Sequence, residues 1–297
     1  MTSDSILATA VIPWRPDHRF DEATFRRQVA TIARGLTTHI YVFGTAGEGY
    51  AVTDAQGDEI AAAFWRAAQD FGVSPMLGVV SLSLPTILGR IERGRALGFR
   101  EFQISLPSWG ALNDRELDAF FAETCGRFPD CRFHHYNLLR TKRLLTAMEY
   151  RRLAAAHPNF VAVKCSTEDP AILADLLTVS PRLKFFFTEF GYALARRTTE
   201  DIGLLISLAT ANHARARRFV AGTDADRDQA VAGLRRMAAA LREISSGQFH
   251  IDGAFDKMLI RLHDAAFPLR LLPPYVAASD ADFERFRAAL PPDWRPD

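Results

Sequence analysis

Lysine is scarce in this chain, so the surroundings of each lysine are informative. Lys164 lies inside the apolar, β-branched segment 160–166. Removing an ammonium group from water is costly, so such a position lowers the pKa of the lysine towards that of a nucleophilic free amine. An amine of this kind can attack a ketone, and the resulting iminium withdraws electrons from the neighbouring carbon. The structural alternative is an edge-strand lysine whose head reaches solvent.

The remaining lysines stand in polar segments that resemble helices or loops. We interpret them as ordinary surface charges. They are Lys142, Lys184 and Lys257.

Tyr136 is the second candidate, at the end of the segment 131–137. Imine formation needs a group that passes protons to and from the attacked oxygen, and a tyrosine hydroxyl can do both. Strand alternation places His134 on the same face as Tyr136 and His135 on the opposite face. A packed aromatic with one hydrogen bond is the alternative for Tyr136. Structural roles are favoured for the histidines, and we expect no metal site.

The third candidate is the glycine-rich turn 44–49, which ends the segment 39–45. Backbone N–H groups around Ala46 and Gly47 could converge on an anion such as a substrate carboxylate, with the Thr45 hydroxyl as an extra donor. The turn matches neither the dinucleotide fingerprint nor the P-loop. Glycine also occurs in such turns for steric reasons alone. We interpret Glu48 as a carboxylate at the start of a helix.

Short β-branched and aromatic segments alternate with amphipathic ones, and they must position these candidates. Eight such units predict parallel strands with right-handed crossovers, closed into a (β/α)8 TIM barrel. A doubly wound sheet is the rival, but it would favour a glycine-rich loop after the first strand, where this chain has the prolines 13 and 16. The predicted strands are 6–14, 39–45, 74–81, 101–107, 131–137, 160–166, 183–189 and 203–209. The clearest helices are 21–34, 55–71, 86–97, 115–127 and 147–156.

The last part of the chain predicts helices appended to the barrel. We place the barrel at residues 1–222 and the C-terminal helical extension at 223–297. The chain has no Gly/Ser-rich linker near this boundary, so the extension is expected to pack on the barrel.

Composition excludes several classes of protein. The chain has 297 residues and a formal net charge of +1, so it lacks the excess of basic charge that supports binding to nucleic acid or to anionic membranes. No segment reaches about 18 uninterrupted apolar residues, and residues 1–5 do not resemble a signal sequence. Three cysteines without a CxxC pair fit a reducing compartment. We therefore expect a cytoplasmic protein that acts on a small molecule.

Three motifs, in their order along the chain, resemble those of the dihydrodipicolinate synthase and N-acetylneuraminate lyase family. They are the glycine-threonine turn after the second strand, Tyr136-Asn137 after the fifth and Lys164 in the sixth. The segments 206–212 and 267–274 are also similar, so the resemblance covers nearly the whole chain. It implies a barrel with a helical extension, often a homotetramer, that performs class I aldolase chemistry on pyruvate or a related 2-oxo acid without a cofactor.

The resemblance also implies roles for individual residues. Lys164 would form the Schiff base and Tyr136 would be the acid–base group. Thr45 and the Ala46 amide would hold the carboxylate of the 2-oxo acid, and the Ile206 carbonyl would line the pocket.

This sequence departs from the family pattern at positions that contact the second substrate. Synthases of the lysine pathway usually carry a second threonine where this chain has Ala46, and paired tyrosines where it has the loop 107–110. After Asn137 the family commonly continues with Pro-Gly and an arginine that binds a distal carboxylate. Here Arg140 or Arg143 could serve, with a surface arginine as the alternative. The loop that contains Trp109 is similar to that of hydratase-aldolases that accept aromatic aldehydes, which implies an apolar acceptor pocket.

These observations predict a Schiff-base-forming lyase that acts on a 2-oxo acid and an aldehyde-type second substrate. Dihydrodipicolinate synthesis and hydratase-aldolase activity are alternatives within the family. Outside it, the alternatives are a catalytically silent 2-oxo-acid-binding barrel, a pyridoxal phosphate enzyme and a metal-dependent aldolase that uses His134 or His135.

Overall fold

The computed structural model describes residues 6–179 and 182–296, so the segment 1–5 lies outside the described part. Its strands form a closed barrel in the order β1 to β8, as the alternating pattern predicts. Each strand pair with a recorded register is parallel. The strands are β1 (Ile6–Ala10), β2 (His39–Val42), β3 (Ser74–Gly78), β4 (Glu101–Ile104), β5 (Arg132–Asn137), β6 (Phe160–Cys165), β7 (Lys184–Phe187) and β8 (Ile202–Leu205).

The chain divides into two compact units. Unit 1 combines Met1–Ser74 with Ile206–Asp297, and unit 2 is Pro75–Leu205. The expected boundary between residues 222 and 223 differs from this division and stays a prediction. The helices of unit 1 are α1 (Glu22–Gly35), α2 (Asp54–Phe71), α8 (His213–Ala221), α9 (Asp224–Ser245), α10 (Asp252–Arg261) and α11 (Asp280–Ala289). Those of unit 2 are α3 (Leu84–Leu97), α4 (Asp114–Phe121), α5 (Ala147–Ala156), α6 (Pro170–Leu177) and α7 (Glu189–Ala195).

Unit 1 contains the first two strand-helix pairs and the predicted C-terminal helices. Except for α10, its helices begin at residues whose side chains accept hydrogen bonds from the free N–H groups of the first turn. Asp21 caps α1 in this way, and Thr53 and Gln56 form a reciprocal capping box on α2. The helix α2 ends at Gly72, whose φ of 64° lies in the left-handed region that favours glycine. Local sequence therefore defines the ends of these helices.

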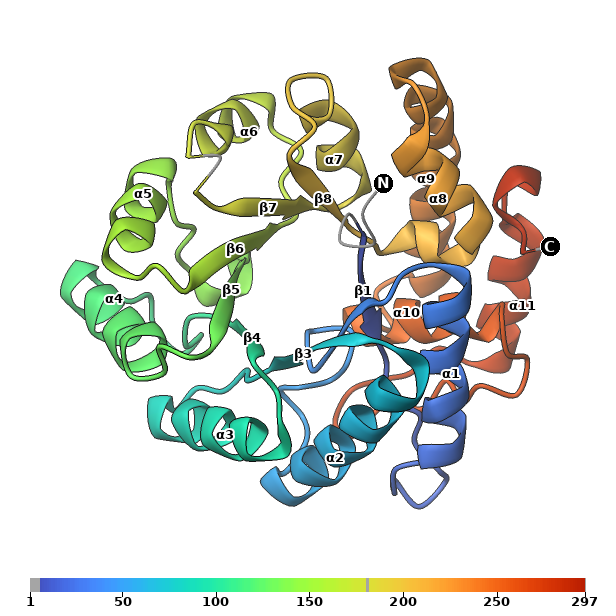
Figure 1. Cartoon of the computed structure of the whole chain (residues 1–297). Coiled ribbons are helices and arrows are strands. Elements are labelled where there is room, and N and C mark those ends of the chain that lie inside the picture. The colour runs from blue at the N-terminus through green and yellow to red at the C-terminus, as the bar shows by residue number, and fades with distance from the viewer. Residues whose placement is uncertain (1–5, 180–181, 297) are drawn as a thin grey trace. The chain divides into compact units, whose positions relative to one another are not determined.

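In unit 2, the helices α3 to α7 lie along one face of the strands β3 to β8 (Figure 1). Aromatic side chains fill this contact. The rings of Phe121 and Phe160 lie 5.1 Å apart, and those of Tyr150 and Phe185 lie 6.0 Å apart. At Gly94 a Cβ atom would lie 2.8 Å from the Phe102 ring, so only glycine lets α3 pack this closely. One face of each of these strands therefore packs against the helices.

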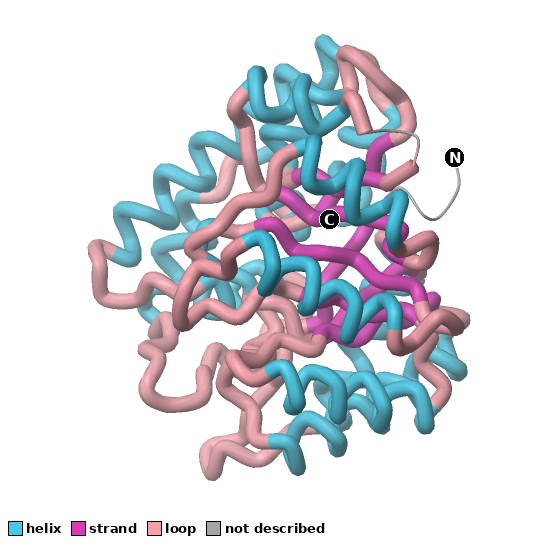
Figure 2. The backbone as a smooth tube through the Cα atoms, turned by 90° about the vertical axis from the view of Figure 1, so that its left-hand side faces the viewer, coloured by secondary structure: helices cyan, strands magenta, loops and turns pink. Residues whose placement is uncertain are grey.

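The predicted strands are all present, but most end before the predicted residue. The first was expected to reach Trp14 and ends at Ala10, and Trp14 instead forms an isolated antiparallel bridge with Phe20. The predicted helix 115–127 is α4 followed by a π-helical turn, Ala122–Gly126. Loops connect many of the strands and helices (Figure 2). After β4 the chain is irregular up to the start of α4, and after β5 the short 3-10 helix Leu139–Thr141 precedes α5. Residues after a strand's last hydrogen bond can adopt irregular conformations, and functional side chains often lie there.

Candidate active site

Lys164 is fully buried in β6. Its register partner on β5 is Tyr136, and Nζ lies 4.5 Å from the centre of the Tyr136 ring. Nζ also donates a hydrogen bond to Oε1 of Gln103, on β4. Desolvation lowers the pKa of Lys164 well below its ordinary range. The side chain is therefore not a surface lysine, and burial favours its neutral, nucleophilic form.

The two histidines of β5 face opposite sides, as strand alternation predicts. His135 points to the helices, where Nδ1 lies 2.9 Å from the Tyr150 hydroxyl, and burial lowers its pKa to about 3. His134 shares the face of Lys164. Its Nε2 lies 2.9 Å from Oε1 of Glu101, and its ring stacks on Phe186 at 6.0 Å. Glu101 and His134 are residues of unit 2 that could contribute ligands to a metal ion.

In unit 1, the residues after β2 form a tight series of turns. Phe43 and Glu48 have φ angles of 66° and 53°, an uncommon backbone conformation for residues other than glycine. A Cβ atom at Gly47 would lie 2.9 Å from the Phe43 backbone nitrogen, so this position requires glycine. Ala46 and Gly47 are buried and Thr45 is half-buried. Their predicted binding of a carboxylate stays a prediction.

The predictions for Glu48 and Lys257 are both wrong. Glu48 is fully buried in the turn and does not begin a helix; Lys257 is fully buried in α10 and is not a surface charge. Lys257 forms an ion pair with Glu48 and donates to the Arg270 carbonyl. Glu48 also accepts hydrogen bonds from Trp14 Nε1 at 2.9 Å and from the Leu272 N–H at 2.8 Å. This network connects the turn to α10 and the segment that follows it.

Burial lowers the pKa of Lys257 to about 8, and the Glu48 carboxylate opposes that shift. Lys257 is therefore charged at neutral pH. A signal for its burial was available in the sequence, because Lys257 stands beside the apolar residues 258–260. Lys184 lies in β7, within the predicted strand 183–189, and is partly buried, so its interpretation as a surface charge in a polar helix or loop is wrong.

We predict that Lys257→Met destabilises the protein strongly. Removing one partner of a buried ion pair leaves Glu48 charged and uncompensated, which costs about 3–5 kcal/mol. Denaturant unfolding of both proteins at neutral pH measures the difference in the free energy of unfolding. Lys142→Met, at an exposed lysine, is the matched control and is expected to change stability by less than about 0.5 kcal/mol. Equal stability of the two variants would contradict the role of the network.

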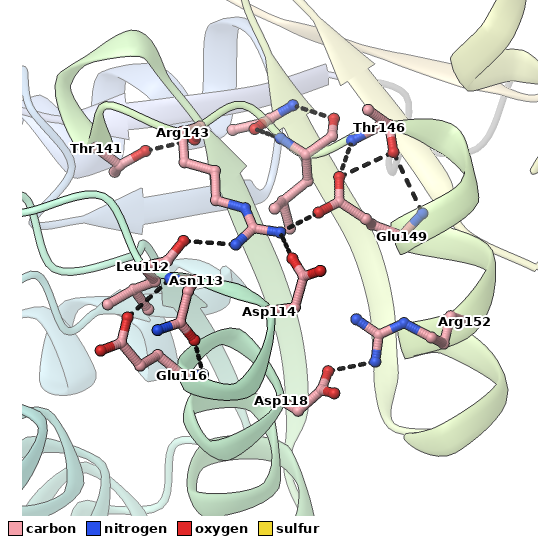
Figure 3. A network of polar contacts seen from close by, with 12 residues as sticks. Leu112, Asn113, Asp114, Glu116, Asp118, Thr141, Arg143, Thr146, Glu149 and Arg152 are labelled. Carbon is pink, nitrogen blue, oxygen red and sulfur yellow. Dashed lines mark hydrogen bonds and ion pairs between the residues drawn. The ribbon is translucent and has the colours of Figure 1, made fainter.

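The guanidinium of Arg143 makes its contacts with other residues of the chain (Figure 3). Its guanidinium donates to the Leu112 carbonyl and forms ion pairs with Asp114, at the start of α4, and with Glu149, in the first turn of α5. Hydrogen bonds to Thr146 and Arg143 lower the pKa of Glu149, although burial opposes the shift. These contacts connect the loop after β5 to two helices, which is a structural role. They argue against Arg143 as a substrate ligand.

Asn137 fixes the start of the same loop. Its side chain accepts a hydrogen bond from the Leu145 N–H at 2.9 Å and donates to the Leu145 carbonyl at 3.1 Å. Arg140 lies between these points and is exposed. Ile206, in unit 1, is buried, and its N–H donates to the Leu7 carbonyl at 3.1 Å. The substrate contacts expected of Arg140 and of the Ile206 carbonyl stay predictions.

The burial of Lys164 predicts a pH-dependent loss of stability. Because the pKa of Lys164 is lower in the folded state than its ordinary value of 10.5, the unfolded chain binds a proton more readily than the folded chain. Lys164 therefore favours unfolding at neutral pH, and this effect disappears as the pH rises towards about 10.4. We expect the stability of the wild type relative to Lys164→Met to increase with pH, as measured by urea unfolding from pH 7 to 10. A constant difference would contradict the neutral amine.

No family model and no curated protein matches the sequence. Solved structures do match the fold, each over nearly the full length of both chains. A dihydrodipicolinate synthase from Bacillus anthracis has a TM-score of 0.82 and 14% identity and covers 97% of this chain and 98% of its own. N-acetylneuraminate lyase from Proteus mirabilis has a TM-score of 0.79 and 16% identity, with coverages of 96% and 98%. YagE of Escherichia coli K12, a dihydrodipicolinic acid synthase family protein in complex with pyruvate, has a TM-score of 0.79 and 14% identity, with coverages of 96% and 96%.

These similarities confirm the expected fold, a (β/α)8 barrel like that of the dihydrodipicolinate synthase and N-acetylneuraminate lyase proteins. At this level of identity the likeness concerns the fold, which supports many different reactions. Among the described residues, no helix combines the length and apolar character needed to cross a membrane.

Proposed function

We propose that this protein is a lyase that forms a Schiff base with pyruvate or a related 2-oxo acid and performs aldol cleavage or condensation. The observation that carries the proposal is the fully buried amine of Lys164, which lies against the ring of Tyr136 and is held by the uncharged side chain of Gln103. Its fold likeness to a pyruvate-bound structure and to N-acetylneuraminate lyase adds support.

The proposed chemistry begins with Lys164. Its nitrogen attacks the carbonyl carbon of the 2-oxo acid, and a proton passes from nitrogen to oxygen to give a carbinolamine. The carbinolamine hydroxyl takes up a proton and leaves as water, which gives an iminium. The iminium accepts the electron pair of the bond between the neighbouring methylene carbon and the next carbon when that bond breaks, and the hydroxyl on the next carbon loses its proton to become the aldehyde carbonyl. The Tyr136 hydroxyl can both donate and accept protons, and we assign it the transfers to and from oxygen. No cofactor is needed in this scheme.

The remaining assignments rest on the resemblance alone. Thr45 and the amides of Ala46 and Gly47 would hold the carboxylate of the 2-oxo acid, the Ile206 carbonyl would line the pocket, and Arg140 would contact the second substrate. The proposal also includes a homotetramer in the cytoplasm. Each of these can be tested separately from the imine.

The second substrate is proposed to be an aldehyde. Two observations favour a hydratase-aldolase over the synthase of the lysine pathway. Ala46 has no hydroxyl where those synthases carry a threonine, and the loop after β4 presents Trp109 with 83% of its surface exposed. The Trp109 carbonyl accepts a hydrogen bond from Lys142 Nζ at 2.7 Å, which holds this loop against the loop after β5. An exposed indole suits an aromatic aldehyde.

The imine can be trapped. We expect incubation with pyruvate and sodium borohydride to leave one reduced adduct per chain on the peptide that contains Lys164, detected by intact-mass and peptide mass spectrometry. Lys164→Ala should give no adduct, while Lys142→Ala should be labelled as the wild type is. Folded wild-type protein without an adduct from pyruvate or other 2-oxo acids would reject the proposal and favour a silent barrel.

Tyr136→Phe removes the hydroxyl and keeps the ring against Lys164. We expect the rate of imine trapping to fall by about 10²-fold or more, because a positioned acid–base group is lost. Single-turnover kinetics with quenching by borohydride measure this rate. Tyr150→Phe removes the hydroxyl of a tyrosine on the helical face and should leave the rate unchanged. An unaltered rate in Tyr136→Phe would exclude the hydroxyl from proton transfer.

A further inference from the structure

Gln103 was not singled out by the sequence motifs, yet it contacts the candidate nucleophile. It is fully buried in β4, and its register partner on β5 is His134. In-register residues of neighbouring strands point to the same face, so Gln103 shares the face of His134, Tyr136 and Lys164. This is the face opposite to the helices. The polar residues 101 and 103 of β4 and residue 105 directly after it alternate with apolar ones, which was the available signal in the sequence.

Only one of the two polar atoms of the Gln103 amide, Oε1, has a hydrogen-bond partner among the described residues. Nζ of Lys164 is a hydrogen-bond donor, so the Gln103 side chain turns its carbonyl oxygen towards Nζ. Nε2 of Gln103 is buried and has no hydrogen-bond partner among the described residues. A buried donor without an acceptor is unfavourable and uncommon in native proteins. An oxygen atom of a bound molecule beside Nζ would satisfy it.

We propose that Gln103 is a positioning residue that holds the Lys164 amine through its carbonyl oxygen and donates from Nε2 to the oxygen of the 2-oxo acid under attack. This inference rests on the proposed function. As Lys164 nitrogen bonds to the carbonyl carbon, the electron pair of the C=O bond moves onto that oxygen, and the Nε2–H stabilises the charge that develops there. The oxygen takes up one proton to become the carbinolamine hydroxyl and a second proton when it leaves as water.

The absence of charge on Gln103 is as important for Lys164 as the hydrogen bond between them. A carboxylate in contact with Nζ would favour the ammonium form, which cannot attack a carbonyl. The other titratable groups on this face of β4 to β7 are Glu101, Arg132, His134, Tyr136 and Lys184. Glu101 is already in contact with His134 and forms an ion pair with Arg132 at 3.7 Å. Gln103 thus gives Lys164 an acceptor without adding charge.

The experiment compares Gln103→Glu, Gln103→Met and the wild type in the rate of pyruvate trapping by borohydride between pH 6 and 10. Gln103→Glu keeps the shape and the acceptor but adds a charge, and we expect the pH of half-maximal trapping to rise by about 1–3 units. Gln103→Met removes acceptor and donor, and we expect trapping to slow by about 10²-fold, as for the loss of one positioned donor to a developing oxyanion.

Gln28→Met is the matched control, because Gln28 is also a buried glutamine but lies in α1. It should trap pyruvate at the wild-type rate. Thermal unfolding of each variant confirms that it is folded. A labelled wild type together with wild-type rate and pH profile in both Gln103 variants would overturn the role of Gln103 and leave the proposed function intact. A wild type that is not labelled at all would overturn both.

Discussion

The desolvation of Lys164 is the constraint on which the candidate site depends. A lysine in a strand that is buried on both faces can exist only if its amine finds an acceptor or gives up its charge. Gln103 provides the acceptor and the Tyr136 ring covers the amine, and neither is an anion. The nearby carboxylate of Glu101 contacts His134 instead. The side chains around Lys164 therefore lower its pKa, and the same arrangement that makes it reactive reduces the stability of the fold.

Lys257 is also a buried lysine, but its charge is balanced by an anion. It is as deeply buried as Lys164, but its partner is the Glu48 carboxylate, and it remains charged at neutral pH. The pair joins the glycine-rich turn of unit 1 to α10, and Glu48 makes further contacts with Trp14 and the Leu272 N–H. One buried lysine thus has a structural role and the other has the environment of a nucleophile. The chemical identity of the nearest acceptor distinguishes them, rather than the extent of burial.

Much of the fold followed from local sequence. Short β-branched and aromatic segments between amphipathic ones predicted the eight strands, and the alternation within β5 predicted the opposite directions of His134 and His135. Lys164 and Tyr136 could be paired because both lie near the carboxyl ends of successive strands. Strand ends were less predictable, since residues such as those after Ala10 have β-forming side chains but no partner in the ladder.

The contacts that define the chemistry could not be predicted in this way. Glu48 and Lys257 are separated by 209 residues, and Lys164 and Gln103 by 61. Neither periodicity nor a local motif relates residues so far apart. Arg143 illustrates the same point. The family resemblance suggested Arg140 or Arg143 as a substrate ligand, whereas the Arg143 guanidinium forms ion pairs with Asp114 and Glu149.

The central claim is that burial lowers the pKa of Lys164 well below its ordinary value, and NMR of protein labelled at the lysine side chains tests it most directly. With only four lysines in the chain the spectrum is simple, and Lys164→Met assigns the signal. The account predicts that the Lys164 signal titrates well below the ordinary pKa of 10.5. A Lys164 signal that titrates at the ordinary value of 10.5 in the folded protein would contradict the account.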